Sequence, residues 1–174
     1  MLLLSSTVVL ACGYRPVYSP DAPRLRVKLV RSLVADAVAS DEVAAGAREE
    51  LARAGMLEAG EGWPRVEVEV LRADEASEGI AARANGPIAR ATNVALVARA
   101  WIATAPDAPP QSDTGDVRAE ETVSADRDGA TGSLDPRASA FHHADALRAA
   151  ARRLGRQLAR RVAGFPASSD DDYR

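Results

Sequence analysis

Val66-Glu67-Val68-Glu69-Val70 alternates strictly between apolar and acidic residues. Successive side chains of a β-strand point to opposite faces of the sheet, so this stretch predicts a strand with three valines on one face and two glutamates on the other. The valine face needs a covering layer, because apolar surface is stabilised by removal from water. The stretch therefore predicts a sheet with one buried face and one open, polar face.

Three further segments predict strands of the same sheet. Leu25–Arg31 alternates apolar with basic residues, and Asn93–Ile102 carries a continuous apolar row on one face. Val117–Ala125 alternates less regularly, because Glu121 falls on the face of its valines. Between these strands the sequence predicts irregular structure through Gly79, a turn at Asn85-Gly86-Pro87 and a loop over Pro106–Asp116.

Two segments predict amphipathic helices. The first starts at Ser40 as N-cap and ends before Gly55, with an apolar stripe at Val43, Ala47, Leu51 and Ala54. The second starts at Asp135-Pro136, an N-cap followed by proline at the first helical position, and is stopped by Gly164 and Pro166. Its stripe keeps steps of three and four residues through Phe141, Ala144, Leu147, Ala151, Leu154, Leu158 and Val162.

The element order is therefore strand, helix, strand, strand, strand, helix (βαβββα). The first crossover makes its two strands parallel, and the last three strands form an antiparallel meander. Both helices need an apolar floor, so we predict an α+β two-layer sandwich: a four-stranded mixed sheet with two helices on the valine face. The open face then carries Glu67, Glu69, Arg99, Trp101, Arg118 and Glu120.

The first sixteen residues, MLLLSSTVVLACGYRP, carry an uncharged apolar run that ends at Val9-Leu10-Ala11, directly before the single cysteine, Cys12. This pattern resembles a bacterial lipoprotein signal, in which the cysteine thiolate receives a diacylglycerol group and the bond between the small residue and the cysteine is cut. A transmembrane helix does not fit, because eleven helical residues span only about 17 Å of a hydrocarbon core about 30 Å thick. A buried first element with a core cysteine is the alternative.

These patterns predict four regions of the chain. Residues 1–11 are the signal peptide, and residues 12–24, with three prolines, are the lipidated cysteine and a flexible tether. Residues 25–166 form one domain, and residues 167–174 are a charged, disordered tail. Because stable anchoring needs more than one chain, we expect diacylglycerol together with an acyl chain such as palmitate on the new amino terminus.

Composition excludes several functions. A net charge of −3 argues against broad nucleic-acid binding, and no phosphate-binding loop, nucleophile elbow or zinc-protease motif occurs. His142-His143-Ala-Asp145 lacks a second ligand cluster, so we expect no metal site. Because none of the motifs named above occurs, we also expect no cofactor and no enzyme activity.

The last helix repeats arginine at Arg148, Arg152, Arg156 and Arg160, which indicates either a solvated face or an anionic partner.

The Cys-Gly-Tyr-Arg-Pro start at Cys12, the short tether, the element order and the closing Arg/Ala/Leu helix together resemble the lipopolysaccharide-assembly lipoproteins of the LptE type. The resemblance implies a plug inside an outer-membrane β-barrel that helps to insert lipopolysaccharide into the outer leaflet. Gly13, where inner-membrane lipoproteins often carry Asp, implies the periplasmic side of the outer membrane. Lipopolysaccharide phosphates would then contact Arg90, Arg99 and Arg118, because guanidinium groups bind phosphate bidentately.

Two other functions stay open. The chain is either an accessory lipoprotein of another envelope system, such as a phospholipid or ABC-type transporter, or a soluble protein whose N-terminus has been misread.

Overall fold

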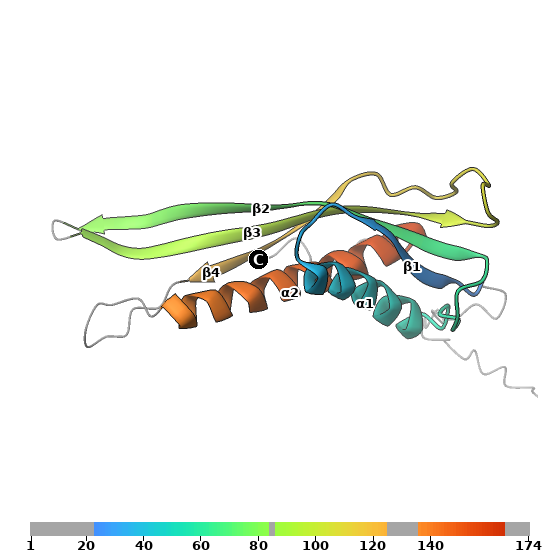
Figure 1. Ribbon diagram of the computed structural model, residues 1–174, viewed down its shortest axis with the longest axis horizontal. Helices are drawn as coiled ribbons and strands as arrows, with labels where there is room; N and C mark the ends of the chain where they lie inside the picture. The colour runs from blue at the N-terminus through green and yellow to red at the C-terminus, as the bar shows by residue number, and fades with distance from the viewer. Residues whose placement is uncertain (1–22, 84–85, 125–135, 166–174) are drawn as a thin grey trace, which may run out of the picture.

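The computed structural model describes residues 23–83, 86–124 and 136–165, with side chains described outside 77–91, 124 and 136–139. Six elements follow in the expected order. They are β1 (Arg26–Ser32), α1 (Ala37–Arg53), β2 (Arg65–Arg83), β3 (Gly86–Ala103), β4 (Val117–Ser124) and α2 (Pro136–Val162). Both helices lie on one side of the sheet, so the fold is the predicted α+β two-layer sandwich (Figure 1).

The sheet order is β1-β2-β3-β4. β1 is parallel to β2, and β2, β3 and β4 are antiparallel neighbours, so the predicted mixed sheet is confirmed. β1 pairs with β2 only as far as Val70, and β4 pairs with β3 only as far as Ala91. Strands β2 and β3 therefore continue together beyond the ends of their outer neighbours (Figure 1).

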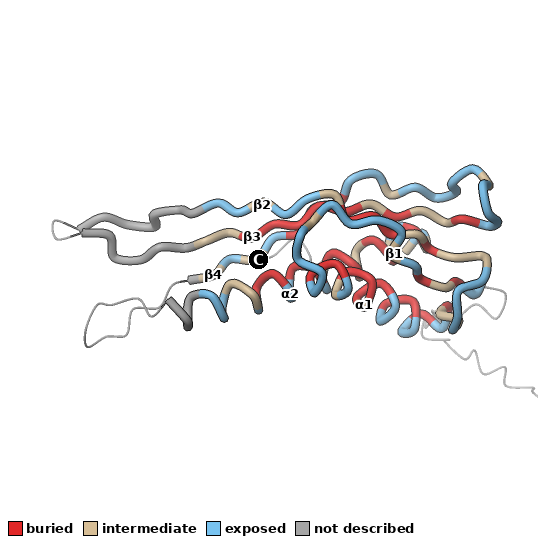
Figure 2. Tube along the Cα trace, viewed as in Figure 1, coloured by how far each residue is buried: buried red, intermediate tan, exposed pale blue. Residues whose placement is uncertain are grey.

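The core lies between the sheet and the helices, where buried residues form a continuous layer (Figure 2). The three valines that predicted the open and buried faces, Val66, Val68 and Val70, are fully buried. The helices contribute mostly alanine and leucine to this layer. The helix residues with no exposed surface are Val43, Ala47 and Leu51 of α1 and Ala150, Ala151, Leu154, Leu158 and Ala159 of α2.

The start of α1 differs from the prediction. Asp36, not Ser40, is the N-cap, and its Oδ1 accepts a hydrogen bond of 3.0 Å from the Ala39 N–H. Both residue types are good caps, but the three residues before Ser40 already have helical geometry. Ser40 is instead buried in the first turn, where its hydroxyl bonds that of Ser32 at 2.7 Å and ties α1 to the end of β1. Gly55 has φ 68°, as expected of the residue after a helix.

Residues 71–92 also differ from the prediction: they form a long β-hairpin and not irregular structure. β2 runs to Arg83 and β3 begins at Gly86. The pairing shifts register between Val70 and Arg72 and twice more between Gly79 and Ala82. Each extra residue moves the following side chains to the other face, so the alternation breaks although the strand continues.

Two residues on the predicted apolar faces, Phe141 and Glu121, are not part of the buried core. Phe141 is 63% exposed, so its place on the core stripe of α2 was wrong; it stands six residues from Leu147, a spacing that turns it away from the sheet. Glu121 does lie on the helix side of β4, where Arg153 of α2 donates to its carboxylate at 2.6 Å. The irregular alternation of that strand therefore marks an ion pair between the layers.

The loop after β3 covers the part of β3 that β4 does not reach. Ile102 and Gln111 exchange two backbone hydrogen bonds, of 2.7 and 2.8 Å, and the Thr114 N–H donates to the Ala100 carbonyl at 2.9 Å.

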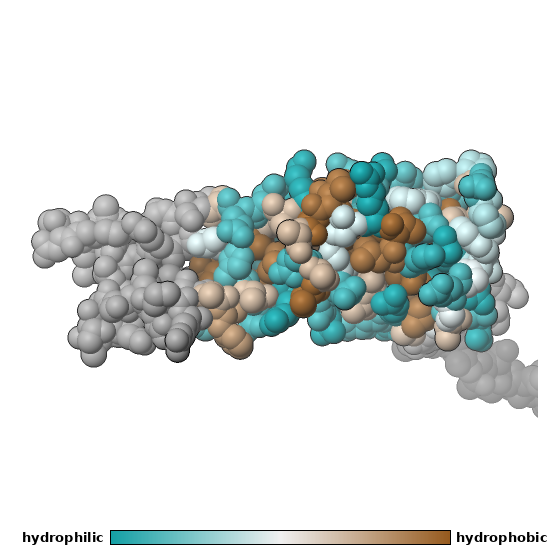
Figure 3. Space-filling view, viewed as in Figure 1, coloured by the Kyte–Doolittle hydropathy of each residue, from teal (hydrophilic) through white to brown (hydrophobic). Residues whose placement is uncertain are grey.

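The side of the molecule on which β1 and α1 lie shows hydrophobic residues among hydrophilic ones (Figure 3). The large hydrophobic residues most exposed near the β1–α1 turn are Val30, Leu33 and Val38.

Candidate functional site

The open face of the sheet gathers the polar residues that the sequence placed there. Register pairs bring Glu67 beside Trp101 and Glu69 beside Arg99 on β2 and β3. On β3 and β4, Val97 pairs with Arg118 and Ala95 pairs with Glu120. The predicted open face is therefore confirmed, and Arg99 and Arg118 share it on neighbouring strands.

Arg99 is anchored to a buried carboxylate. Its Nε and Nη2 lie 2.8 and 2.7 Å from Oε2 of Glu69, whose residue is only 4% exposed. Arg31 of β1 approaches the other carboxylate oxygen at 3.4 Å, and the Arg99 guanidinium lies 5.4 Å from the ring centre of Trp101. A buried carboxylate without such donors would be costly, so Arg99 first of all compensates Glu69.

A second cluster lies one pair further along the sheet. Arg65 donates to Oε1 of Glu67 through Nε at 2.9 Å and Nη2 at 2.6 Å, and the Trp101 indole N–H donates to Oε2 at 3.0 Å. The Arg65 guanidinium also lies 3.6 Å from the ring centre of Trp63, the distance of a cation–π contact. Both oxygens of Glu67 are therefore occupied by charged or aromatic donors.

Arg118 belongs to a third cluster that the sequence did not predict. It donates to Glu120 through Nε and to Asp74 through Nη1 at 3.3 Å, and Arg72 approaches the same Asp74 oxygen at 3.2 Å. Because Arg72 and Asp74 pair with Val97 and Ala95, this cluster lies over two buried apolar residues of the open face. The sequence did not place Asp74 on the open face because it follows the register shift in β2. After that shift, the alternation of apolar and polar residues no longer indicates which face of the sheet a side chain lies on.

The open face is thus a surface of paired charges with unused donor capacity. The side chains of Arg99 and Arg118 are 43% and 47% exposed, and each guanidinium has five N–H donors. Arg99 directs Nε and Nη2 to Glu69, and Arg118 directs Nε and Nη1 to carboxylates. An oxyanion that approaches from solvent can be bound without breaking these pairs.

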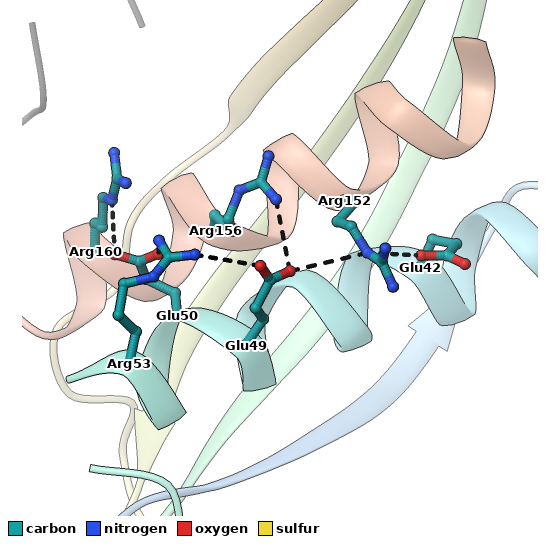
Figure 4. Close-up of polar contacts among 7 residues, drawn as sticks. All are labelled: Glu42, Glu49, Glu50, Arg53, Arg152, Arg156 and Arg160. Carbon is teal, nitrogen blue, oxygen red and sulfur yellow. Dashed lines mark hydrogen bonds and ion pairs between the residues drawn. The ribbon is translucent and has the colours of Figure 1, made fainter. Parts of the chain in front are cut away.

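Arg152, Arg156 and Arg160 of α2 contact acidic residues of α1 (Figure 4). Arg152 lies 3.1 Å from Glu42, Arg156 lies 3.5 Å from Glu49, and Arg160 lies 2.8 Å from Glu50. Arg53 of α1 also pairs with Glu49 and Glu50, so that these ion pairs form a ladder along the two helices. This part of the arginine repeat therefore holds the two helices together and is neither simply a solvated face nor bound to a separate anionic partner.

The remaining predicted site residues are not all described. Cys12 and its neighbour Ala11 lie outside the described residues, so the lipidation and cleavage predictions stay predictions. Arg90 has a described backbone only, paired with Gly79 in the β2–β3 hairpin. Across the described ranges no group of three or more His, Cys, Asp or Glu side chains could hold a metal ion. No helix in these ranges is long and apolar enough to cross a membrane.

Comparison with known proteins finds likeness among solved structures only. The chain is similar to a minor lipoprotein from Acinetobacter baumannii, with 12% identity and a TM-score of 0.48 over 82% of this chain and 94% of that one. It is similar to lipoprotein B from Nitrosomonas europaea, with 12% identity and a TM-score of 0.44 over 85% and 91% of the two chains. For rare lipoprotein B from Shewanella oneidensis the identity is 12% and the TM-score 0.40, over 74% and 93%. No family model and no curated protein matches the chain.

Proposed function

We propose that this chain is an outer-membrane lipoprotein, anchored through Cys12 on the periplasmic side, that acts as a non-enzymatic plug and assembly subunit of the lipopolysaccharide translocon barrel. The observation that carries the proposal is the open face of the sheet. It is polar from Arg65 to Glu120, yet its charges are already paired with one another.

Such a face suits the lumen of a large β-barrel. Barrel lumens are polar, and a plug must present polar groups to them without leaving single charges unpaired in a confined space. The Arg99–Glu69 and Arg65–Glu67 pairs meet that requirement within the chain itself. The opposite face of the sheet is covered by α1 and α2, so the polar face is the surface that the sheet offers to a partner.

Lipopolysaccharide is the ligand that the exposed guanidinium groups suit. Arg99 and Arg118 stand on adjacent strands of one face, and each guanidinium has more N–H donors than its carboxylate contacts use. Phosphate groups accept such donors in charge-assisted hydrogen bonds. The carboxylates beside them orient each guanidinium, but they also compete with phosphate for its N–H donors.

Affinity purification from detergent-solubilised outer membranes tests this function. A β-barrel subunit of several hundred residues, bound in a one-to-one complex that contains lipopolysaccharide, is the expected result. Recovery of a solute-binding protein or an ATPase would instead select an accessory lipoprotein of another envelope transporter. Mass spectrometry of the mature chain checks the anchor: an intact Met1 with unmodified Cys12 would overturn the proposal.

A further inference from the structure

The edge of β2 beyond β1 is open. β1 pairs with β2 from Arg26 to Ser32, and the last backbone hydrogen bond on this side runs from the Leu33 N–H to the Val70 carbonyl at 2.9 Å. The chain then leaves the sheet to form α1, whereas β2 continues to Arg83. Among the described residues, nothing pairs with β2 on this side past Val70.

The open backbone groups of this edge can be assigned from the pairing. Val70 directs its carbonyl toward β1, and one extra residue separates it from Arg72 in the register with β3. Alternate residues of a strand direct their backbone groups to opposite neighbours, so Arg72 and Asp74 face β3. Ala73, Glu75 and Ser77 therefore direct their N–H and C=O groups to the side of β2 on which β1 lies, where no described strand pairs with them.

In the part of the chain that the structure describes, β2 has an unpaired edge past Val70. Protein edges are usually shortened or covered, because their free N–H and C=O groups attract other strands. Opposite Ala73–Ser77, β3 is paired with β4 on its other side, so this part of the sheet already has three strands. An added strand would satisfy the open edge of β2 there.

Exposed apolar side chains lie where the unpaired edge of β2 begins, next to Val70. Leu33, hydrogen-bonded to Val70, is 57% exposed, and Val38 in the first turn of α1 is 48% exposed. The Ser32–Ser40 hydrogen bond holds that turn against the end of β1. A strand placed beside β2 would therefore meet hydrophobic side chains at one end and backbone donors and acceptors along its length.

Charge selects the kind of strand. Residues 72–79 of β2 contain one arginine against three acids, Asp74, Glu75 and Glu78. Asp74 contacts Arg72 and Arg118, and Glu75 lies 3.0 Å from His143, but the two side chains remain 42% and 62% exposed. Two copies of this chain paired edge to edge would oppose acids with acids, which is destabilising in a sheet. A segment with basic residues is favoured, and it has to be a loop or terminal segment of its protein, because the strands of a closed barrel have no free edge.

We propose that the edge of β2 from Ala73 to Ser77 binds an extended, basic segment of the barrel subunit by β-strand addition. This inference rests on the proposed function for the identity of its partner. The added strand supplies main-chain hydrogen bonds to Ala73, Glu75 and Ser77, and its first apolar side chain covers Leu33.

Hydrogen exchange of the full-length lipoprotein tests the proposal, alone and in the purified barrel complex. The amides of Ala73, Glu75 and Ser77 should exchange at least about 100-fold more slowly in the complex, while those of Val66 and Val68 stay equally protected in both. A complex in which the barrel is present but these amides exchange as in the free protein overturns the strand addition and leaves the proposed function standing. Failure to recover any barrel overturns both.

Substitution provides a second test. Ala73→Pro together with Ser77→Pro removes two outward N–H donors and leaves the β2–β3 hydrogen bonds intact, whereas Ala73→Thr with Ser77→Thr keeps all donors. The proline pair should lose at least about 10-fold in barrel retention and the threonine pair should not, with equal thermal unfolding of both. Equal retention overturns the proposal. Concentration-dependent protection of the same amides in the free lipoprotein would identify a second copy as the occupant and would also overturn it.

Discussion

Gly155 of α2 lies directly against the backbone of Val43 in α1: a Cβ atom at Gly155 would stand 2.0 Å from the Val43 carbonyl oxygen. The contact is reciprocal, because a Cβ at Gly46 would stand 2.2 Å from the carbonyl oxygen of Arg152. Two helices whose backbones approach this closely cannot accept any side chain at the crossing. The glycines therefore set the distance between the helices, and with it the positions of the ion pairs beside them.

Gly155→Ala should destabilise the domain by about 2 kcal/mol or more, because the added methyl forces the helices apart. In an ordinary helix interior the same change stabilises by about 0.5–1 kcal/mol, so the sign alone is diagnostic. Urea denaturation followed by circular dichroism measures the free energy of unfolding. Arg161→Ala, at an exposed position of the same helix, is the control. A neutral or stabilising Gly155→Ala would contradict the close crossing.

Glu50→Gln and Glu49→Gln form a matched pair on α1. Glu50 has a side chain only 10% exposed and receives Arg53 and Arg160 within 2.8 Å, whereas the Glu49 side chain is 42% exposed with longer contacts. We expect Glu50→Gln to cost about 1–2 kcal/mol of unfolding free energy and Glu49→Gln less than about 0.5 kcal/mol. Thermal denaturation at low and high salt checks both. Equal effects would show that burial does not decide the strength of this ladder.

A double-mutant cycle tests the dependence of Glu69 on Arg99. Arg99→Met leaves the buried carboxylate with only the exposed Arg31, so about 2 kcal/mol should be lost. Adding Glu69→Gln removes the buried charge, and the double variant should recover at least about 1 kcal/mol of that loss. Arg31→Ala is the control, with an expected effect below about 0.5 kcal/mol. Additive losses would mean that the two residues are not coupled.

Lipopolysaccharide binding should respond to Arg118 and to its partner in opposite directions. Arg118→Ala should weaken binding about 5-fold, whereas Glu120→Gln should strengthen it by a similar factor, because it frees a guanidinium donor for phosphate. Titration of the purified protein with lipopolysaccharide at one fixed salt concentration measures both. Glu58→Gln, which lies at the Arg26 ion pair, is the control. If neither variant changes the affinity, Arg118 is not part of the binding site.

Cys12→Ala should release the protein from the membrane without unfolding it. The thiol is the predicted acceptor of the lipid, and the first core residue in the described part of the chain is Leu25. Fractionation of cells should move the variant to the soluble fraction, with a thermal midpoint equal to that of the detergent-solubilised wild type. Thr7→Ala serves as the control, because it keeps the cysteine. Continued membrane association of a Cys12→Ala chain from which residues 1–11 have been removed would refute the lipid anchor.

The sequence alone determined the element order, the faces of the regular strands and the composition of the core. Val66–Val70 and the stripe from Leu147 to Val162 were predictable because side-chain period is a local property, set by backbone geometry within a few residues. The open face followed from the same alternation. It also placed Arg99 and Arg118 together, since strands that pair in register share their faces.

Only the tertiary structure decided the long β2–β3 hairpin and the partners of the charges. Register shifts after Val70 and Gly79 erase the two-residue period, and nothing within the strand marks them. Arg160 and Glu50 are separated by 110 residues, so their contact depends on how two helices cross. The two helices cross where Gly46 and Gly155 let their backbones meet. The distance between α1 and α2 depends on the side chains of both helices, so the sequence of one helix does not determine it.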